Sequence, residues 1–178
     1  MERPLALAGF ESQSASAHAA AVLGGVVVFL VGYFGAVAAL YGDVSVLALE
    51  ANIGAQRVGG VAGAVLVWAY FALAFVRGYG SPVGNAVVYP LVIVVVAPFL
   101  ARWAVFGPDV SGLIDRFVGL FLLEPLVTTV IVVFPGLGTG TTVLFLWATL
   151  LSDERRREWE RTHLPAAFLE AFVDDSLE

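Results

Sequence analysis

Cysteine is absent from the 178-residue chain, which excludes disulfides, thiol catalysis and cysteine-ligated metals. Histidine is scarce: His18 and His163 lie outside the long apolar runs. No His, Asp or Glu residues recur at metal-ligand spacing, and no catalytic set of serine and histidine lies within the apolar runs. We therefore expect no cofactor, no metal site and no enzymatic activity.

Lysine is also absent, so nine arginines face fifteen acidic residues and the net charge is −6. A phosphate-binding P-loop needs a lysine, and an acidic chain is a poor ligand for nucleic acid, so we expect neither. Acidic excess without lysine is typical of proteins in concentrated salt, where charge repulsion is screened. We expect a halophilic archaeal source. A GC-rich genome that favours arginine codons is the alternative.

Charged residues of either sign make up only 13 % of the chain, about half the usual share in soluble domains, while hydrophobic residues make up 60 %. A soluble fold of this length has too little interior to bury so much apolar surface. We predict an all-α, polytopic transmembrane helix bundle in the cell membrane, with the lipid bilayer as its solvent.

Five apolar runs predict five spans within a bundle covering residues 19–152. The predicted spans are 19–40, 58–76, 86–106, 113–134 and 136–152. The second run has 19 uncharged residues between two arginines, a rise of about 28 Å and close to the ~30 Å hydrocarbon core. The first run is longer than the apolar stretch of a signal peptide, so we interpret it as a retained helix. Four spans are the alternative, with residues 125–151 forming one broken helix.

The flanks are polar. Residues 1–18 form a polar tail, and residues 153–178 form a charged and amphipathic segment in which Asp153 and Arg157 have the spacing of a helical ion pair. Apolar side chains from Leu164 to Phe172 recur at helical spacing and predict a short amphipathic helix.

Arginine placement predicts the orientation, because basic residues collect on the cytoplasmic side. Arg155, Arg156 and Arg157 directly follow the last apolar run, so we expect the C-terminus to be cytoplasmic. Five spans then place the N-terminus outside and keep three further arginines on the inner side, whereas four spans would place those three outside. These are Arg57, Arg102 and Arg116. We therefore favour five.

Glu124 is the main candidate site residue, because it is the twelfth of the 22 residues in the fourth run. Charged residues at a helix centre cost about 2.5–3.5 kcal/mol on insertion scales. Pro125 frees the carbonyl of Phe121 beside it, and Thr128 lies one turn away. This combination predicts a proton, cation or substrate site. The alternative is a structural glutamate that is protonated or hydrogen-bonded to a neighbouring helix.

Three further features are interpreted structurally. Arg102 and Asp115 (or Asp109) flank the loop between the third and fourth runs and predict a structural ion pair. The glycine-rich segment from Pro135 to Thr142 predicts an inter-helix turn rather than a cation filter. Gly59-x-x-x-Gly63 predicts close helix packing, within the chain or in a dimer.

Two functions remain. A non-catalytic membrane subunit or assembly component, in a homo-oligomer or with another membrane protein, explains the glycine-rich faces and the lack of a catalytic set. The alternative is a small oligomeric transporter or channel subunit that uses Glu124. The second interpretation requires this carboxyl group to face a polar cavity or a subunit interface.

Overall fold

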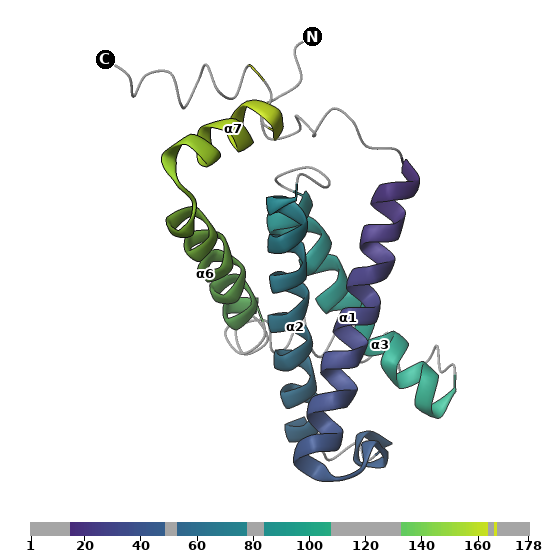
Figure 1. The fold of residues 1–178 in the computed structure, drawn as a ribbon. Helices are drawn as coiled ribbons and strands as arrows, with labels where there is room; N and C mark the ends of the chain where they lie inside the picture. Colours follow the sequence, from purple (N-terminus) through teal and green to yellow (C-terminus); the bar gives the residue numbers. More distant parts are fainter. Residues whose placement is uncertain (1–14, 49–52, 78–83, 108–132, 164–165, 167–178) are drawn as a thin grey trace.

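The computed structural model describes residues 15–48, 53–77, 84–107, 133–163 and 166, and every element in this part of the chain is helical. The all-α class is therefore confirmed. The elements are α1 (Ala15–Tyr41), the 3-10 helix η2 (Val44–Ala48), α2 (Ile53–Val76), the π-helical turn η3 (Gly84–Val88), α3 (Tyr89–Phe106), α6 (Phe134–Leu150) and α7 (Asp153–His163) (Figure 1).

Three of the described helices are long and apolar enough to cross a membrane: Ala15–Tyr41, Ile53–Val76 and Gly84–Val105. They correspond to the first three predicted spans, and each begins two to five residues earlier because polar or small residues continue the helix. The predicted fourth span, 113–134, lies almost entirely outside the described residues. Helix α6 has 17 residues and rises about 26 Å, which is short for a complete crossing.

Helices α1 and α2 lie side by side and antiparallel (Figure 1). Glycines on each helix face aromatic rings on the other. A Cβ added to Gly63 would lie 2.6 Å from the ring of Phe29, and one added to Gly25 would lie 2.7 Å from Phe71. Both rings are fully buried. The missing side chains thus allow the helices to approach closely, as the Gly59-x-x-x-Gly63 spacing predicted.

Helix α3 packs across α1 and α2 and buries Ile93, Val94, Ala97 and Ala101 along one face. Its opposite face exposes apolar side chains such as Val92. Helix α1 likewise exposes Leu23, Val27 and Val31, each about three-fifths accessible. Apolar side chains that point away from the protein are compatible with a bilayer as surroundings, because lipid tails replace water there.

The segment predicted as a turn is helical, which corrects that prediction. Pro135 lies in the first turn of α6, where its missing N–H costs no hydrogen bond. The hydroxyl of Thr139 donates to the Pro135 carbonyl at 2.8 Å, and that of Thr142 donates to the Gly138 carbonyl at 2.7 Å. The glycines that suggested a turn are instead the contact face of a helix: Gly136 and Gly140 are buried against α2.

Helix α7 and the end of α2 both lie at the top of Figure 1, and Trp159 joins them. The Trp159 indole N–H donates to the Val76 carbonyl, and its ring centroid lies 5.4 Å from that of Phe75 and 4.9 Å from that of Trp147. The ion pairs of α7 centre on Arg156, which pairs with Asp153 at 3.1 Å. The sequence predicted Arg157 as the partner of Asp153, whereas the structure has Arg156, one residue earlier.

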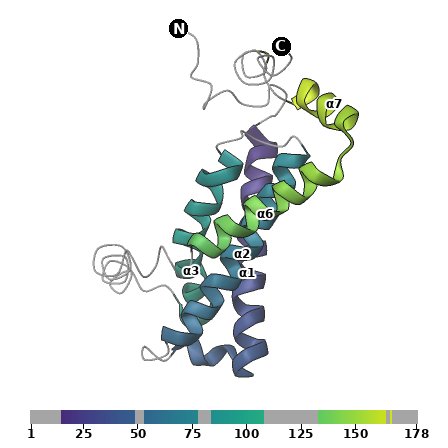
Figure 2. The same ribbon diagram turned by 90° about the vertical axis from the view of Figure 1, so that its left-hand side faces the viewer.

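The start of α1 lies at the same end of the bundle as α7. The Tyr70 hydroxyl, near the end of α2, donates to the Ala21 carbonyl at 3.1 Å, and His18 lies against Tyr89 near the start of α3. Five complete crossings would place α7 at the opposite end from the start of α1. Helix α6 instead runs in the same direction as α2, crossing it obliquely in Figure 2.

Candidate functional site

Most of the residues predicted to form a site are not among those that the structure describes. Glu124, Thr128 and Asp115 lie outside the described residues. Arg102 lies near the end of α3. Neither the intramembrane carboxylate site nor the Arg102–Asp115 ion pair is tested, and both stay predictions.

A different site is built around Trp68, which lies in α2 and is 2 % exposed. Its ring lies against two glycines of α6, one turn apart. A Cβ added to Gly136 would lie 2.3 Å from Trp68 Cε3, and one added to Gly140 would lie 3.0 Å from Trp68 Cδ1. Only glycine at these positions leaves room for the indole, so the ring fixes where α6 meets α2.

The polar edge of Trp68 also has a defined partner. Its Nε1–H donates to the Ala86 carbonyl of η3 at 3.1 Å. In a regular α-helix that carbonyl would accept from the residue four positions later, which is Pro90 and has no N–H. In membrane helices, neighbouring helices commonly satisfy carbonyls freed by proline. Trp68 supplies that donor here, at the point where the π-helical turn leads into α3.

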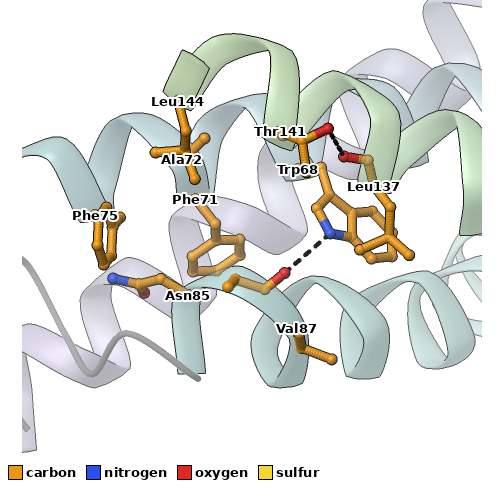
Figure 3. Close-up of a pocket in the computed structure, with 11 residues that line it drawn as sticks. Trp68, Phe71, Ala72, Phe75, Asn85, Val87, Leu137, Thr141 and Leu144 are labelled. Atoms are coloured by element: carbon orange, nitrogen blue, oxygen red, sulfur yellow. Dashed lines mark hydrogen bonds between the residues drawn. The ribbon is translucent and has the colours of Figure 1, made fainter. Parts of the chain in front are cut away.

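A cavity of about 440 Å³ lies beside Trp68, between α2, η3 and α6 (Figure 3). Its volume is within the roughly 300–1,000 Å³ range of ligand pockets. Most of the lining is apolar. The lining side chains and backbone come from Trp68, Phe71, Ala72, Phe75, Asn85, Ala86, Val87, Leu137, Gly140, Thr141 and Leu144.

Two lining residues have polar side chains. Asn85 is 2 % exposed and is the buried polar residue of the described core. An amide carries two donors and an acceptor with two lone pairs, and it does not titrate. The hydroxyl of Thr141 accounts for its proton within α6, through contacts of 3.0 Å to the carbonyls of Leu137 and Gly138.

One wall of the cavity is also a contact of α7. Phe75 lines the cavity and stacks at a tilt on Trp159. The Val76 carbonyl, which accepts from Trp159, is one of the last four carbonyls of α2, which have no donor within the helix. The indole of Trp159 therefore caps α2 and holds the charged helix α7 beside the cavity wall.

The chemistry open to this cavity is binding. None of the lining residues is ionisable. Within the described ranges, no group of three or more His, Cys, Asp or Glu residues could hold a metal ion. The arrangement suits an apolar molecule.

The sequence interpretation missed both Trp68 and Asn85, and of the two only Trp68 left a signal. Trp68 lies well inside the second apolar run, away from the span ends where membrane tryptophans usually collect. Asn85 directly precedes the third run and was counted as loop. The proline rule that pointed to Phe121 also identifies Ala86 through Pro90, so a carbonyl in need of a donor was predictable there.

Comparison with known proteins adds no relative. We found no match to this chain among protein-family models, curated proteins or solved structures. The function is therefore argued from the described residues alone.

Proposed function

We propose that this chain is a multi-pass membrane protein that serves as a non-catalytic subunit or assembly component, with a further helix packed on α6. The observation that carries this proposal is the unequal covering of α6. One face packs on α2 through Gly136 and Gly140, whereas the opposite face is open. Gly138 has no atom within 4 Å of an added Cβ, and Thr142, one turn later, is exposed.

This open face has the composition of a helix–helix contact in a membrane. Small residues four positions apart let backbones approach closely, and large apolar side chains then pack around them. Phe145 continues the same face and is 67 % exposed. A second copy of the chain or another membrane protein would supply the covering helix.

Light scattering in a mild detergent tests the subunit proposal. We expect the wild-type particle to contain more than one protein chain, and Gly138→Leu to reduce it to a single chain by filling the contact. Gly35→Leu is the matched control, because Gly35 on α1 also has open space around an added Cβ. A wild-type particle that contains a single chain contradicts the proposal.

We propose further that the chain crosses the membrane an even number of times, with the start of α1 and helix α7 on the cytoplasmic side. This replaces the expectation of five spans and an outside N-terminus, and agrees with the four-span alternative. The contacts of Trp159 with Phe75 and Val76 support it. Arg77 and the four arginines of α7 then share the cytoplasmic end, whereas Arg57, Arg102 and Arg116 lie on the outer side.

Cysteine labelling tests this topology directly, because the native chain contains no cysteine. Single cysteines replace Ser16, Thr162 and Ser45, and a membrane-impermeant maleimide is applied to intact cells. We expect Ser45→Cys alone to react. Opposite accessibility of Ser16→Cys and Thr162→Cys would restore an odd number of spans.

The transporter alternative depends on Glu124 and Thr128 and stays a prediction. Proton and cation flux into vesicles containing the wild type or Glu124→Gln tests it. A flux that the wild type supports and Glu124→Gln abolishes, with unchanged thermal stability, would replace the subunit proposal. Absence of flux in both proteins leaves the subunit proposal standing.

A further inference from the structure

We infer that the end of the bundle at α7 binds an anionic membrane lipid, whose phosphate is held by Arg155 of α7 and Arg77 after α2. This inference does not depend on the subunit proposal, which concerns the open face of α6, or on the number of spans. Three observations support it: the attachment of α7 to the end of a span, the separation of charges around α7, and the two exposed arginines beside that attachment.

Trp159 fixes α7 at the end of α2. Its indole N–H donates to the carbonyl of Val76, the last residue of α2, and its ring contacts those of Phe75 and Trp147. Because α2 is long and apolar enough to cross a membrane, its last residue lies near a membrane surface. The backbone is extended at Leu151, so α7 lies across this end of the bundle instead of continuing α6 (Figure 1). Helix α7 is therefore at the level of lipid headgroups.

Basic and acidic side chains occupy different faces of α7. Residues three or four positions apart share a face of a helix, whereas those one or two apart do not. By this rule, Arg155 and Arg156 lie on the face of Trp159. No acidic residue of α7 lies three or four positions from Trp159; the acidic residues are Asp153, Glu154, Glu158 and Glu160. Since Trp159 contacts the end of α2, the face turned toward the bundle is the basic one.

Two arginines at this place are available to a ligand. Arg156 is already engaged, because it pairs with Asp153 at 3.1 Å and lies 3.9 Å from Glu160. Arg155 and Arg77 are exposed, and neither forms an ion pair with a residue that the structure describes. Arg77 directly follows Val76, and Arg155 lies one turn from Trp159, so both adjoin the contact between α7 and α2.

A phosphate fits these two side chains. The planar guanidinium group of arginine donates two parallel hydrogen bonds to phosphate oxygens. The indole N–H of Trp159 is already used by Val76, so the arginines supply the donors. A zwitterionic lipid carries a cation beside its phosphate, which the arginines repel. An anionic lipid carries none, and each basic residue near the surface then favours binding by about fivefold.

Native mass spectrometry on the delipidated protein in detergent tests the inference, with phosphatidylglycerol and phosphatidylcholine as probes. We expect the wild type to bind the first phosphatidylglycerol at least about fivefold more tightly than phosphatidylcholine. This comparison needs no variant. Equal affinity of the wild type for the two lipids overturns the inference.

A pair of double variants locates the site. Arg77→Gln with Arg155→Gln should abolish the preference for phosphatidylglycerol. Arg157→Gln with Arg161→Gln is the matched control, because it removes the same charge from exposed positions two residues on either side of Trp159, away from its face. We expect the control to keep the preference. An equal loss in both double variants overturns the inference.

Inorganic phosphate separates a lipid from a free anion as the source of the phosphate. In molar excess over phosphatidylglycerol, it should leave the bound lipid in place, because it has no hydrocarbon chain to contact the apolar helix faces. Displacement of the lipid by inorganic phosphate overturns the lipid as occupant.

Discussion

The two interfaces of α2, with α1 and with α6, both place glycines against aromatic rings, but only the interface with α6 separates to leave a cavity between the helices. On the α1 side, glycines belong to both helices, and four of them face an aromatic ring of the other helix: Gly24, Gly25, Gly59 and Gly63. On the α6 side, both glycines belong to α6, and both face the single ring of Trp68. The first interface buries the rings of Phe29 and Phe71 completely, whereas the second adjoins a cavity of about 440 Å³.

The difference shows that the distribution of glycines decides where two membrane helices separate. Gly25 and Gly63 lie on different helices and at different depths, so α1 and α2 remain close over several turns. Gly136 and Gly140 lie one turn apart, so α6 and α2 are close only at Trp68. Beyond that point Leu144 and Phe75 keep the helices apart and line the open space.

We call the interface of α2 with α1 the closed interface and the interface of α2 with α6 the open interface. The largest expected effect on stability is in the closed interface. Gly63→Ala places a methyl group 2.6 Å from a ring of Phe29 that is fully buried and has no space to move into. We expect a loss of about 1–3 kcal/mol in unfolding free energy, the usual cost of overpacking. Thermal unfolding in detergent measures it. Gly35→Ala is the control, since its methyl group meets open space. Equal stability of the two variants would show that the interface is not tightly packed.

A smaller effect is expected from the hydrogen bond of the open interface. Trp68→Phe keeps a ring but removes the donor to Ala86, at a cost of about 0.5–1.5 kcal/mol for the hydrogen bond. Tyr70→Phe is the corresponding change on the α1 side, where the carbonyl of Ala21 keeps its helical donor from Gly25. We expect it to cost less. A larger loss for Tyr70→Phe would contradict the role assigned to Pro90.

The same methyl insertion in the open interface should cost less still. Gly136→Ala brings a methyl group 2.3 Å from Trp68 Cε3, closer than the methyl group of Gly63→Ala to Phe29, but Trp68 adjoins the cavity and so has space to move that the fully buried Phe29 lacks. We expect a loss below about 1 kcal/mol, under the usual overpacking range. Gly138→Ala, on the open face of α6, is the control. A loss larger than that of Gly63→Ala would remove the distinction between the two interfaces.

The smallest effect lies at the far end of the closed interface, in the turn after α1. The hydroxyl of Ser45, with its backbone N–H at 2.9 Å, donates to Asp43 and holds the pKa of this carboxyl below its ordinary value of 3.8. A lowered pKa contributes stability above the unfolded-state pKa, and that stability is lost as pH falls through the folded-state pKa. Carboxyl NMR titration should give a midpoint below 3.8, and Ser45→Ala should raise it. Ser45→Thr keeps the hydroxyl and should not.

The sequence was informative where one property dominates. Runs of about twenty uncharged residues predicted three helices, since the energetic cost of a charge in lipid exceeds local preferences. The turn predicted at residues 135–142 was wrong because glycine propensity ignores what the glycine touches, here Trp68. Arginine counting favoured five spans, which stays a prediction because most of the fourth run lies outside the described residues.

The cavity was not predictable, because it results from the separation of two helices rather than from any motif. Its polar residue, Asn85, lies one position outside an apolar run and has no distinguishing pattern. The residues that the sequence did single out, Glu124 and Thr128, lie outside the described part of the chain.

The carbonyl of Ala86 has a consequence for assembly. Apolar helix faces allow a neighbour to slide by a turn at little cost, because one leucine or valine replaces another. A backbone carbonyl that accepts from a side chain of the next helix does not allow this, since Trp68 reaches the Ala86 carbonyl at one axial offset only. The hydrogen bond from the Trp68 indole to the Ala86 carbonyl thus sets the axial register between α2 and the start of α3.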